Sequence, residues 1–145
     1  MIAQMYGPVE GRRHDTTLLK MSNLNQRMTL LPPNSFVYGD QAYPVRHWLL
    51  SPFRGPNKTH AMRRWNASMR TCRISVEHGF KMVTSLFAHL KYVPAQKVFK
   101  TPVANQYIVC TALTNIHNCL HPNQVAQHYG MQPMSVEEYC AMYAQ

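Results

Sequence analysis

A run without proline between His60 and Leu90 constrains the fold of this chain more than any other feature. Within the run, apolar residues recur at steps of three and four, at Trp65, Met69, Cys72, Val76, Phe80, Val83 and Phe87. This spacing brings them to one face of a helix, so the run predicts one long amphipathic helix or two abutting ones. Gly79 is the position at which such a helix is weakest.

The size and composition of the chain set the class of protein. Its 145 residues suit one domain rather than two, and a hydrophobic fraction of 46% supplies a core and argues against wholesale disorder. No stretch approaches the roughly 18 apolar residues that a membrane span needs, and the order of a signal peptide is missing, so we expect a soluble intracellular protein. The four cysteines form no CxxC pair, which predicts reduced thiols.

The charge of the chain is strongly one-sided, with 15 Lys and Arg residues against 6 Asp and Glu residues. Six basic residues follow one another without an intervening acid: Arg54, Lys58, Arg63, Arg64, Arg70 and Arg73. A field of one sign attracts polyanions and adds a salt-dependent contribution to nucleic-acid binding. A solvated basic face with no particular partner is the alternative interpretation of the same residues.

Shorter patterns predict the remaining elements of the first half. Residues 2–6 alternate loosely and should form a short strand, ended by a Gly-Pro turn. Asp15 is placed to cap a helix that carries Leu18, Leu19, Met21 and Leu24 on one face. Residues 35–40 predict a buried strand that delivers Asp40 at its carboxyl end, and residues 47–50 predict a short helix.

The second half of the chain reads as helical. Thr101 and Pro102 suit the N-cap and first position of a buried helix over residues 103–120. Ser135 and Glu138 have the spacing of a capping box, which predicts a short terminal helix. His117 and His121 could contribute to a zinc site, but no second paired motif accompanies them, so ordinary histidines near a helix end are the favoured interpretation.

Two of the few acids stand where carboxylates could do chemistry. Asp40 follows the predicted strand, and Glu77 lies on the polar side of the long helix, four residues after Arg73. One interpretation is an ordinary ion pair between Arg73 and Glu77, which would contribute a few tenths of a kcal/mol to helix stability. The other is that Asp40 and Glu77 converge on a divalent metal ion, for which carboxylate oxygens are suitable ligands.

Several blocks together resemble a known family. They are GPVEGRRHD (7–15), YGDQAYP (38–44), LLSPF (49–53), Trp65-Asn66, RISVEHGFK (73–81) and LTNIHN (113–118). In order and spacing they resemble the DDE superfamily endonucleases of the PIF/Harbinger transposases, over residues 1–121. The resemblance implies an α/β, partial RNase H-like fold with few strands and a predominantly helical carboxyl-terminal half, followed by a tail over residues 122–145 with a short helix.

The resemblance also implies a chemistry. The family binds two divalent ions, Mg²⁺ or Mn²⁺, with a triad of two Asp and one Glu, and so cleaves and joins DNA. Asp40 matches the second acid and Glu77 the third, while Asp15 matches a family landmark outside the triad. Arg63, Arg64 and Arg70 are candidates for phosphate contacts, and Arg73 is a candidate for orienting Glu77.

The first acid of the triad has no counterpart in the matching blocks. In the family it precedes the block that opens this sequence, so we expect an amino-terminally truncated domain with weak or absent activity. Glu10 lies in a loop and is not expected to replace it. The third and fourth strands would remain, and they are not neighbours in the parent fold. Either they pair in a non-native way, with exposed edges that favour self-association, or the helices carry most of the packing.

Three functions follow as hypotheses. The first is a metal-dependent DNA endonuclease domain; the second is a non-catalytic DNA-binding or protein-interaction remnant of a transposase; the third is a basic structural domain without a nucleic-acid partner. No helix-turn-helix or zinc-finger reader of base edges is recognisable. The resemblance implies a separate Myb-like partner protein and a nuclear setting, with the cytoplasm as the alternative.

Overall fold

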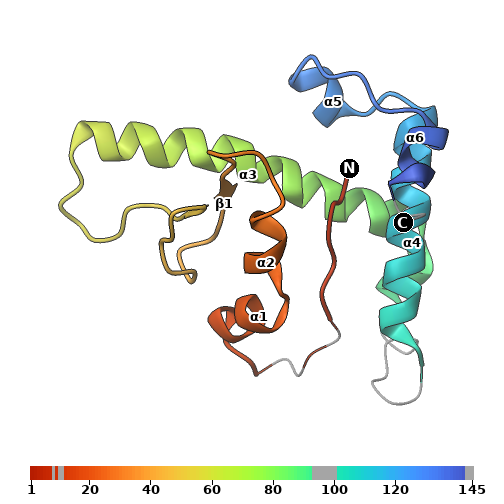
Figure 1. The fold of residues 1–145 in the computed structure, drawn as a ribbon, viewed down its shortest axis with the longest axis horizontal. Coiled ribbons are helices and arrows are strands. Elements are labelled where there is room, and N and C mark those ends of the chain that lie inside the picture. The colour runs from red at the N-terminus through yellow and green to blue at the C-terminus, as the bar shows by residue number, and fades with distance from the viewer. Residues whose placement is uncertain (8, 10–11, 93–100, 143–145) are drawn as a thin grey trace. The chain divides into compact units, whose positions relative to one another are not determined.

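The computed structural model describes residues 1–7, 9, 12–92 and 101–142, and within them the chain is mostly helical (Figure 1). It divides into two compact units, which we name the strand unit, Pro8–Ile74, and the helical unit, Met1–Gly7 with Ser75–Gln145. Glu10 and the segment 93–100 lie outside the described residues. None of the described helices combines the length and apolar character needed to cross a membrane.

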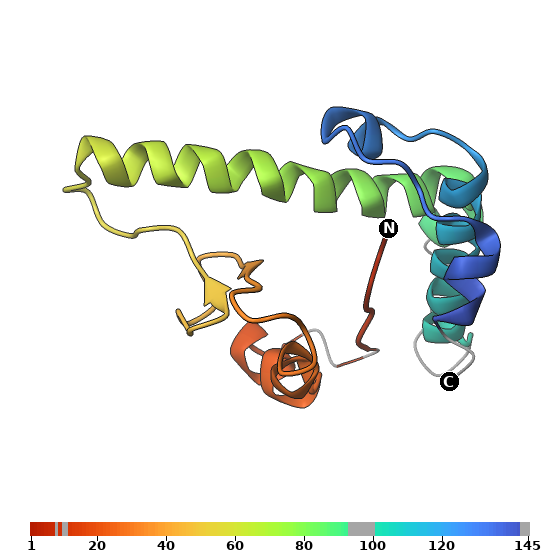
Figure 2. The same cartoon turned by 45° about the horizontal axis from the view of Figure 1, so that its top comes forward.

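Helix α3, His60–Leu86, confirms the long helix predicted from the proline-free run (Figure 2). Its 27 residues pass through Gly79 without a break, and a 3-10 helix, η1 (Ala88–Lys91), follows it. The apolar face is only partly covered. Met69 and Val83 are buried, whereas Trp65 and Phe80 are 42% and 49% exposed.

The strand unit begins with two short helices, α1 (Asp15–Met21) and α2 (Leu24–Met28). The predicted capping by Asp15 is wrong by one position: helix α1 begins at Asp15, and His14 holds the N-cap without a side-chain hydrogen bond. The carboxylate of Asp15 instead lies in the first turn, where the helix dipole favours a negative charge.

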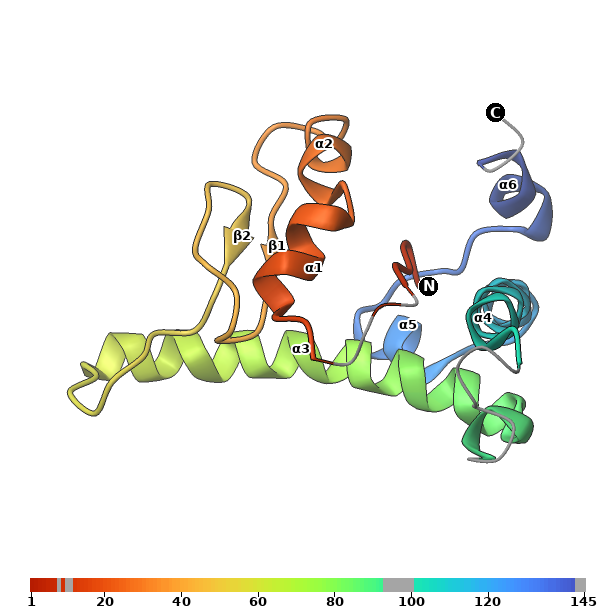
Figure 3. The same ribbon diagram turned by 90° about the horizontal axis from the view of Figure 1, so that it is seen from below.

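The sheet of the strand unit consists of β1 (Val37–Tyr38) and β2 (Leu49–Leu50) (Figure 3). The two strands pair in parallel, with Val37 opposite Leu49. β1 confirms the strand predicted before Asp40, although it is shorter and Tyr38 is exposed. The helix predicted over residues 47–50 is wrong. A short apolar run fits either element, and here the Val37 N–H donates to the carbonyl of Trp48, at 2.8 Å.

The core of the strand unit lies between its helices and its strands. Met28, Trp48 and Leu49 are buried together, and they pack against side chains from α1, α2 and β1. The indole Nε1 of Trp48 donates to Oδ1 of Asn25 at 2.9 Å, so its one polar atom is satisfied. The core therefore fixes β2 against β1, and with it the start of the segment that carries Asp40.

The helical unit is built on α4, Val103–Leu120, which confirms the second predicted helix. Pro102 rather than Thr101 holds its N-cap position. Two short helices follow: α5 (Gln124–His128), which the sequence did not predict, and α6 (Val136–Ala141), where Ser135 and Glu138 form the predicted capping box.

The predicted strand at residues 2–6 is wrong, because this segment pairs with no strand in the described chain. Its backbone bonds to a side chain instead. The Ile2 N–H donates to Oδ1 of Asn115 at 2.9 Å, and Nδ2 of Asn115 donates to the Ile2 carbonyl at 2.8 Å. The two strands expected to survive from the parent sheet, over residues 2–6 and 35–40, therefore do not pair with each other. The strand found within residues 35–40, β1, pairs with β2 instead.

Candidate metal and nucleic-acid site

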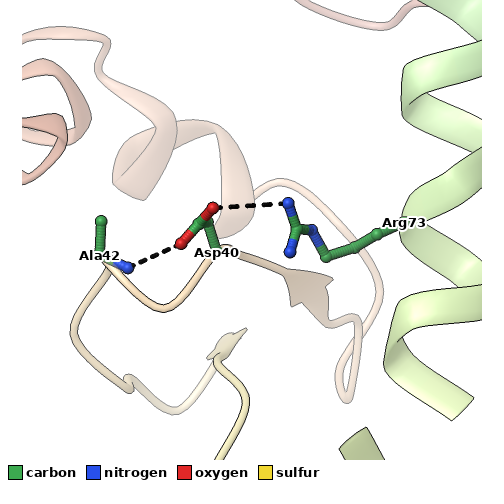
Figure 4. Close-up of polar contacts among 3 residues, drawn as sticks. All are labelled: Asp40, Ala42 and Arg73. Atoms are coloured by element: carbon green, nitrogen blue, oxygen red, sulfur yellow. Dashed lines mark hydrogen bonds and ion pairs between the residues drawn. The ribbon is translucent and has the colours of Figure 1, made fainter. Parts of the chain in front are cut away.

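Asp40 is held by the turn that ends strand β1. Its Oδ1 accepts a hydrogen bond from the backbone N–H of Ala42 at 2.9 Å (Figure 4). Its carbonyl accepts from the N–H of Tyr43 at 3.1 Å. This is the local bonding by which aspartate stabilises a turn. The Asp40 side chain is 52% exposed, so its carboxylate can reach a ligand from solvent.

Gly39 explains how the turn approaches the strand pair so closely. A Cβ atom at this buried position would lie 3.0 Å from Cδ1 of Leu49 and 3.2 Å from Cδ2 of Tyr43. Both contacts are tighter than side chains normally make, so a larger residue would displace the turn. The glycine before Asp40 therefore sets where the carboxylate stands.

Arg73 supplies the positive partner of Asp40. Its Nη2 lies 3.5 Å from Oδ2 of Asp40, from helix α3 (Figure 4). Both side chains are substantially exposed, so the ion pair contributes at most about 1 kcal/mol and is easily exchanged for another partner. The sequence paired Arg73 with Glu77; in the described residues its ion pair is with Asp40.

Tyr43 interacts electrostatically with both Asp40 and Asp15. Partial burial raises the pKa of the Tyr43 phenol above its usual value, and the negative charges of Asp15 and Asp40 raise that pKa further. The phenol is therefore protonated at neutral pH, and it stands within the field of both carboxylates. Sequence reasoning missed this residue, although it lies in the YGDQAYP block.

Glu77 lies on helix α3 with an exposed side chain, one turn after Arg73. Glu77 belongs to the helical unit, whereas Asp40 belongs to the strand unit. Their convergence on one metal ion stays a prediction. In the described part of the chain, no group of three or more His, Cys, Asp or Glu side chains could hold a metal ion.

The histidines and cysteines offer little to a metal. The rings of His117 and His121 lie 4.5 Å apart, centroid to centroid, near the end of α4. All four cysteines are free, as predicted. Burial raises the pKa of the Cys110 thiol, so this cysteine is kept in its neutral, unreactive form.

The three arginines expected to contact phosphates stand on helix α3. Arg63, Arg64 and Arg70 are all exposed, and none of them makes an ion pair with a described residue. Arg63 and Arg70 are seven residues apart, which puts them on the same side of the helix at about 10 Å along its axis. Positive charges on one side of a helix can contact phosphates along a nucleic-acid backbone.

Comparison with known proteins identifies one family. Residues 2–115 match the family described as DDE superfamily endonuclease, which is most of the chain and includes Asp40, Arg73 and Glu77. Comparisons with curated proteins and with solved structures give no match. The match confirms the resemblance of the sequence blocks at the level of this superfamily.

Proposed function

Since the chain belongs to the DDE superfamily endonucleases, we propose that it is a transposase-derived, metal-dependent DNA endonuclease domain of the PIF/Harbinger type. The observation that carries the proposal is the position of Asp40. This half-exposed carboxylate stands at the carboxyl end of a strand, inside the region that matches the family. Catalytic acids need that combination of a fixed backbone and an accessible side chain.

The strand pairing supports an RNase H-like parent fold. The family resemblance implies a sheet with the strand order 3-2-1-4-5, in which the fourth and fifth strands are neighbours. β1 ends just before Asp40, and β2 follows it in the chain and pairs with it in parallel. We therefore assign β1 and β2 to the fourth and fifth strands, which replaces the expectation of two strands that are not neighbours.

We assign Asp40 and Glu77 as the protein ligands of Mg²⁺ or Mn²⁺. Their hard carboxylate oxygens fit these ions, and Mg²⁺ is commonly held by one or two carboxylates together with substrate phosphates. Asp40 fits this role because its carboxylate is half exposed, and its partners among the described residues are one backbone N–H and Arg73, at 3.5 Å. When bound, the metal activates the attacking water or hydroxyl and stabilises the leaving oxygen.

The chain's own arginines have two tasks in this proposal. Arg63, Arg64 and Arg70 bind the phosphates of the DNA, and their contacts weaken as salt rises. Arg73 neutralises the charge of Asp40, and it lies one turn before Glu77 on helix α3, so it is a positioning residue for both acids. The choice of a target sequence falls to a separate Myb-like protein, and the setting is nuclear.

The activity of this chain is weak in the proposal, because two of the three triad acids are assigned. Errors of about 1 Å in the placement of reacting groups can cost a factor of about 100 in rate. The second candidate, a non-catalytic DNA-binding remnant, is favoured because no group of three or more His, Cys, Asp or Glu side chains among the described residues could hold a metal ion. The two differ in whether DNA is cut.

Nicking of supercoiled plasmid DNA tests the proposal. With Mg²⁺ or Mn²⁺ we expect slow nicking that stops on chelation and is lost in Asp40→Asn and Glu77→Gln. The matched control is Glu137→Gln, an exposed acid in the first turn of α6, which should nick at the original rate. Nicking that survives both substitutions contradicts the assignment. DNA binding without nicking in any form favours the remnant, and binding that is insensitive to salt favours neither.

A further inference from the structure

A hollow of about 520 Å³ lies in the strand unit and has no role in the proposed cleavage. Three aromatic side chains, Tyr43, Phe53 and Trp65, line it together with Arg54 and two prolines. Its volume is in the range of small-molecule sites. Tyr43 also stands near Asp40, so the hollow is next to the proposed metal ligand.

Two sequence blocks that the proposed cleavage leaves unused build this hollow. The Phe53 N–H donates to Oδ1 of Asn66 at 2.9 Å, and Nδ2 of Asn66 donates to the Phe53 carbonyl at 3.1 Å. The LLSPF segment is thereby fixed to helix α3 at the residue after Trp65. Ser51 Oγ donates to the Tyr43 carbonyl at 2.9 Å, and this bond holds two further lining residues together. The hollow is therefore held in shape before any ligand arrives.

The aromatic rings remain accessible in the hollow. Phe53 and Trp65 are each 42% exposed, although large aromatic side chains normally bury most of their surface. A flat, apolar ligand could cover these rings. An aromatic face that is held in place and open to solvent is the surface on which single-stranded nucleic acids stack their bases.

The charge in the hollow favours an anionic ligand. Among the side chains that line it, that of Arg54 is the charged one, and the carboxylates of Asp15 and Asp40 act on Tyr43 from outside the lining. Arg54 lines the hollow, and one of its guanidinium nitrogens donates to the carbonyl of Gln41. A guanidinium has further N–H donors in its planar fork, so Arg54 can bind a phosphate as well. A purely apolar peptide would leave this positive charge unused.

We propose that the hollow binds one unstacked nucleobase of a DNA strand, with the base against Trp65 and the adjoining phosphate on Arg54. The inference rests on the proposed function for its ligand, DNA, and it adds that this ligand is single-stranded where it meets the strand unit. It does not depend on metal or on cleavage.

Tryptophan fluorescence in EDTA provides the test, with a thymidine oligonucleotide and a duplex of the same length as probes. The chain has two tryptophans: Trp48, which is buried, and Trp65, which is accessible. We expect the single strand to quench Trp65. The anisotropy of a fluorescein-labelled oligonucleotide measures the affinity of variants that lack Trp65, and by this measure Trp65→Ala should weaken single-strand binding about 5- to 150-fold, as base stacking on an aromatic ring implies. Duplex binding should change less than about twofold.

Three variants keep the test sharp. Trp65→Phe retains a ring and should bind within about threefold of the original protein, which excludes misfolding as the cause of the loss. Phe80→Ala is the matched control, an exposed aromatic residue on the same helix about 22 Å further along its axis, and should change nothing. Arg54→Gln should weaken binding of the single strand. It should also reduce the slope of the logarithm of the binding constant against the logarithm of the salt concentration by about one.

The outcomes separate this inference from the proposed cleavage. Quenching and strand selectivity that depend on Trp65 support the nucleobase site even where plasmid nicking fails. Equal loss of single-strand and duplex binding in Trp65→Ala, or no loss, overturns it. So does a change of sedimentation in Trp65→Ala without a change in DNA binding, since that result assigns the hollow to a second copy of the chain.

Discussion

The two units of this chain bury different kinds of side chain. The strand unit closes an apolar cluster of Met28, Trp48 and Leu49, with a hydrogen bond from Trp48 to Asn25. The helical unit has a small apolar cluster around Val83, but the buried side of α4 is largely polar: Thr111, Thr114, Asn115 and Asn118. Apolar periodicity locates helices in both units. Thr114 and Asn115 are hydrogen-bonded, as buried polar groups usually are, whereas Oδ1 of Asn118 has no hydrogen-bond partner among the described residues.

The largest expected effect is in the strand unit. Trp48→Ala should lower the free energy of unfolding by about 3–5 kcal/mol, since it empties the centre of the cluster. Urea unfolding followed by the remaining tryptophan, Trp65, reports this unit alone, because both tryptophans lie in it. The matched control Trp65→Ala removes a partly exposed ring and should cost less. Equal losses would show that the cluster is not the core of the unit.

The corresponding break in the helical unit is Asn115→Ala. It removes the two bonds to the backbone of Ile2 and one from Nδ2 to the hydroxyl of Tyr139, at 3.3 Å, and should cost about 2–3 kcal/mol. Circular dichroism should show the loss while the tryptophan transition of the strand unit stays in place. Asn105→Ala, an exposed site on the same helix, is the control. A shift of both transitions would mean that the units unfold together.

A smaller effect is expected at the start of α6. Ser135 Oγ accepts the N–H of Glu138 at 3.1 Å, and Glu138 Oε2 accepts the N–H of Ser135 at 2.8 Å. Ser135→Ala should destabilise the helical unit by about 1 kcal/mol, measured by thermal melting. Ser68→Ala, at an exposed site of helix α3, should have almost no effect. An unchanged melt in Ser135→Ala would show that α6 adds nothing to the unit.

The smallest effect is a gain. Gly79→Ala should stabilise helix α3 by about 0.5–1 kcal/mol, because alanine loses less backbone entropy and the new Cβ would meet only Ile2 Cγ1, at 3.8 Å. Gly55→Ala is the counterpart in the strand unit and should destabilise, since Gly55 has a φ of 88° that alanine adopts poorly. Thermal melts of the two variants that move in the same direction would contradict this.

Much of the helical architecture could be predicted from the sequence. The spacing of apolar residues and the absence of proline gave α3 and α4, and the Ser135–Glu138 pattern gave α6, because these signals act within a few residues of one another. The strands were harder. Leu49 and Leu50 pair with β1, and Ile2 bonds to the side chain of Asn115, so the state of these segments depends on partners that are distant in the chain.

The candidate site was predicted in part. Asp40 stands at the end of a strand as expected, because a glycine and an acid after a β-rich run mark a strand end. The sequence did not predict that Arg73 would pair with Asp40 or that Tyr43 would lie near it. The link between Phe53 and Asn66, which shapes the aromatic hollow, was also invisible, although both blocks were noticed. Side-chain hydrogen bonds across a dozen or more residues leave no periodic signal in a sequence.

By itself, then, the sequence determined the long helix, the basic one-sided charge, the acid at the strand end and the membership of the DDE superfamily endonucleases. These properties are local, or are carried by ordered blocks of residues. Only the tertiary structure decided that Arg73 faces Asp40, that β1 takes β2 as its neighbour, and that three aromatic rings surround one hollow. The physical reason is that contacts between distant segments depend on packing and on satisfying each buried polar atom, which no single segment specifies.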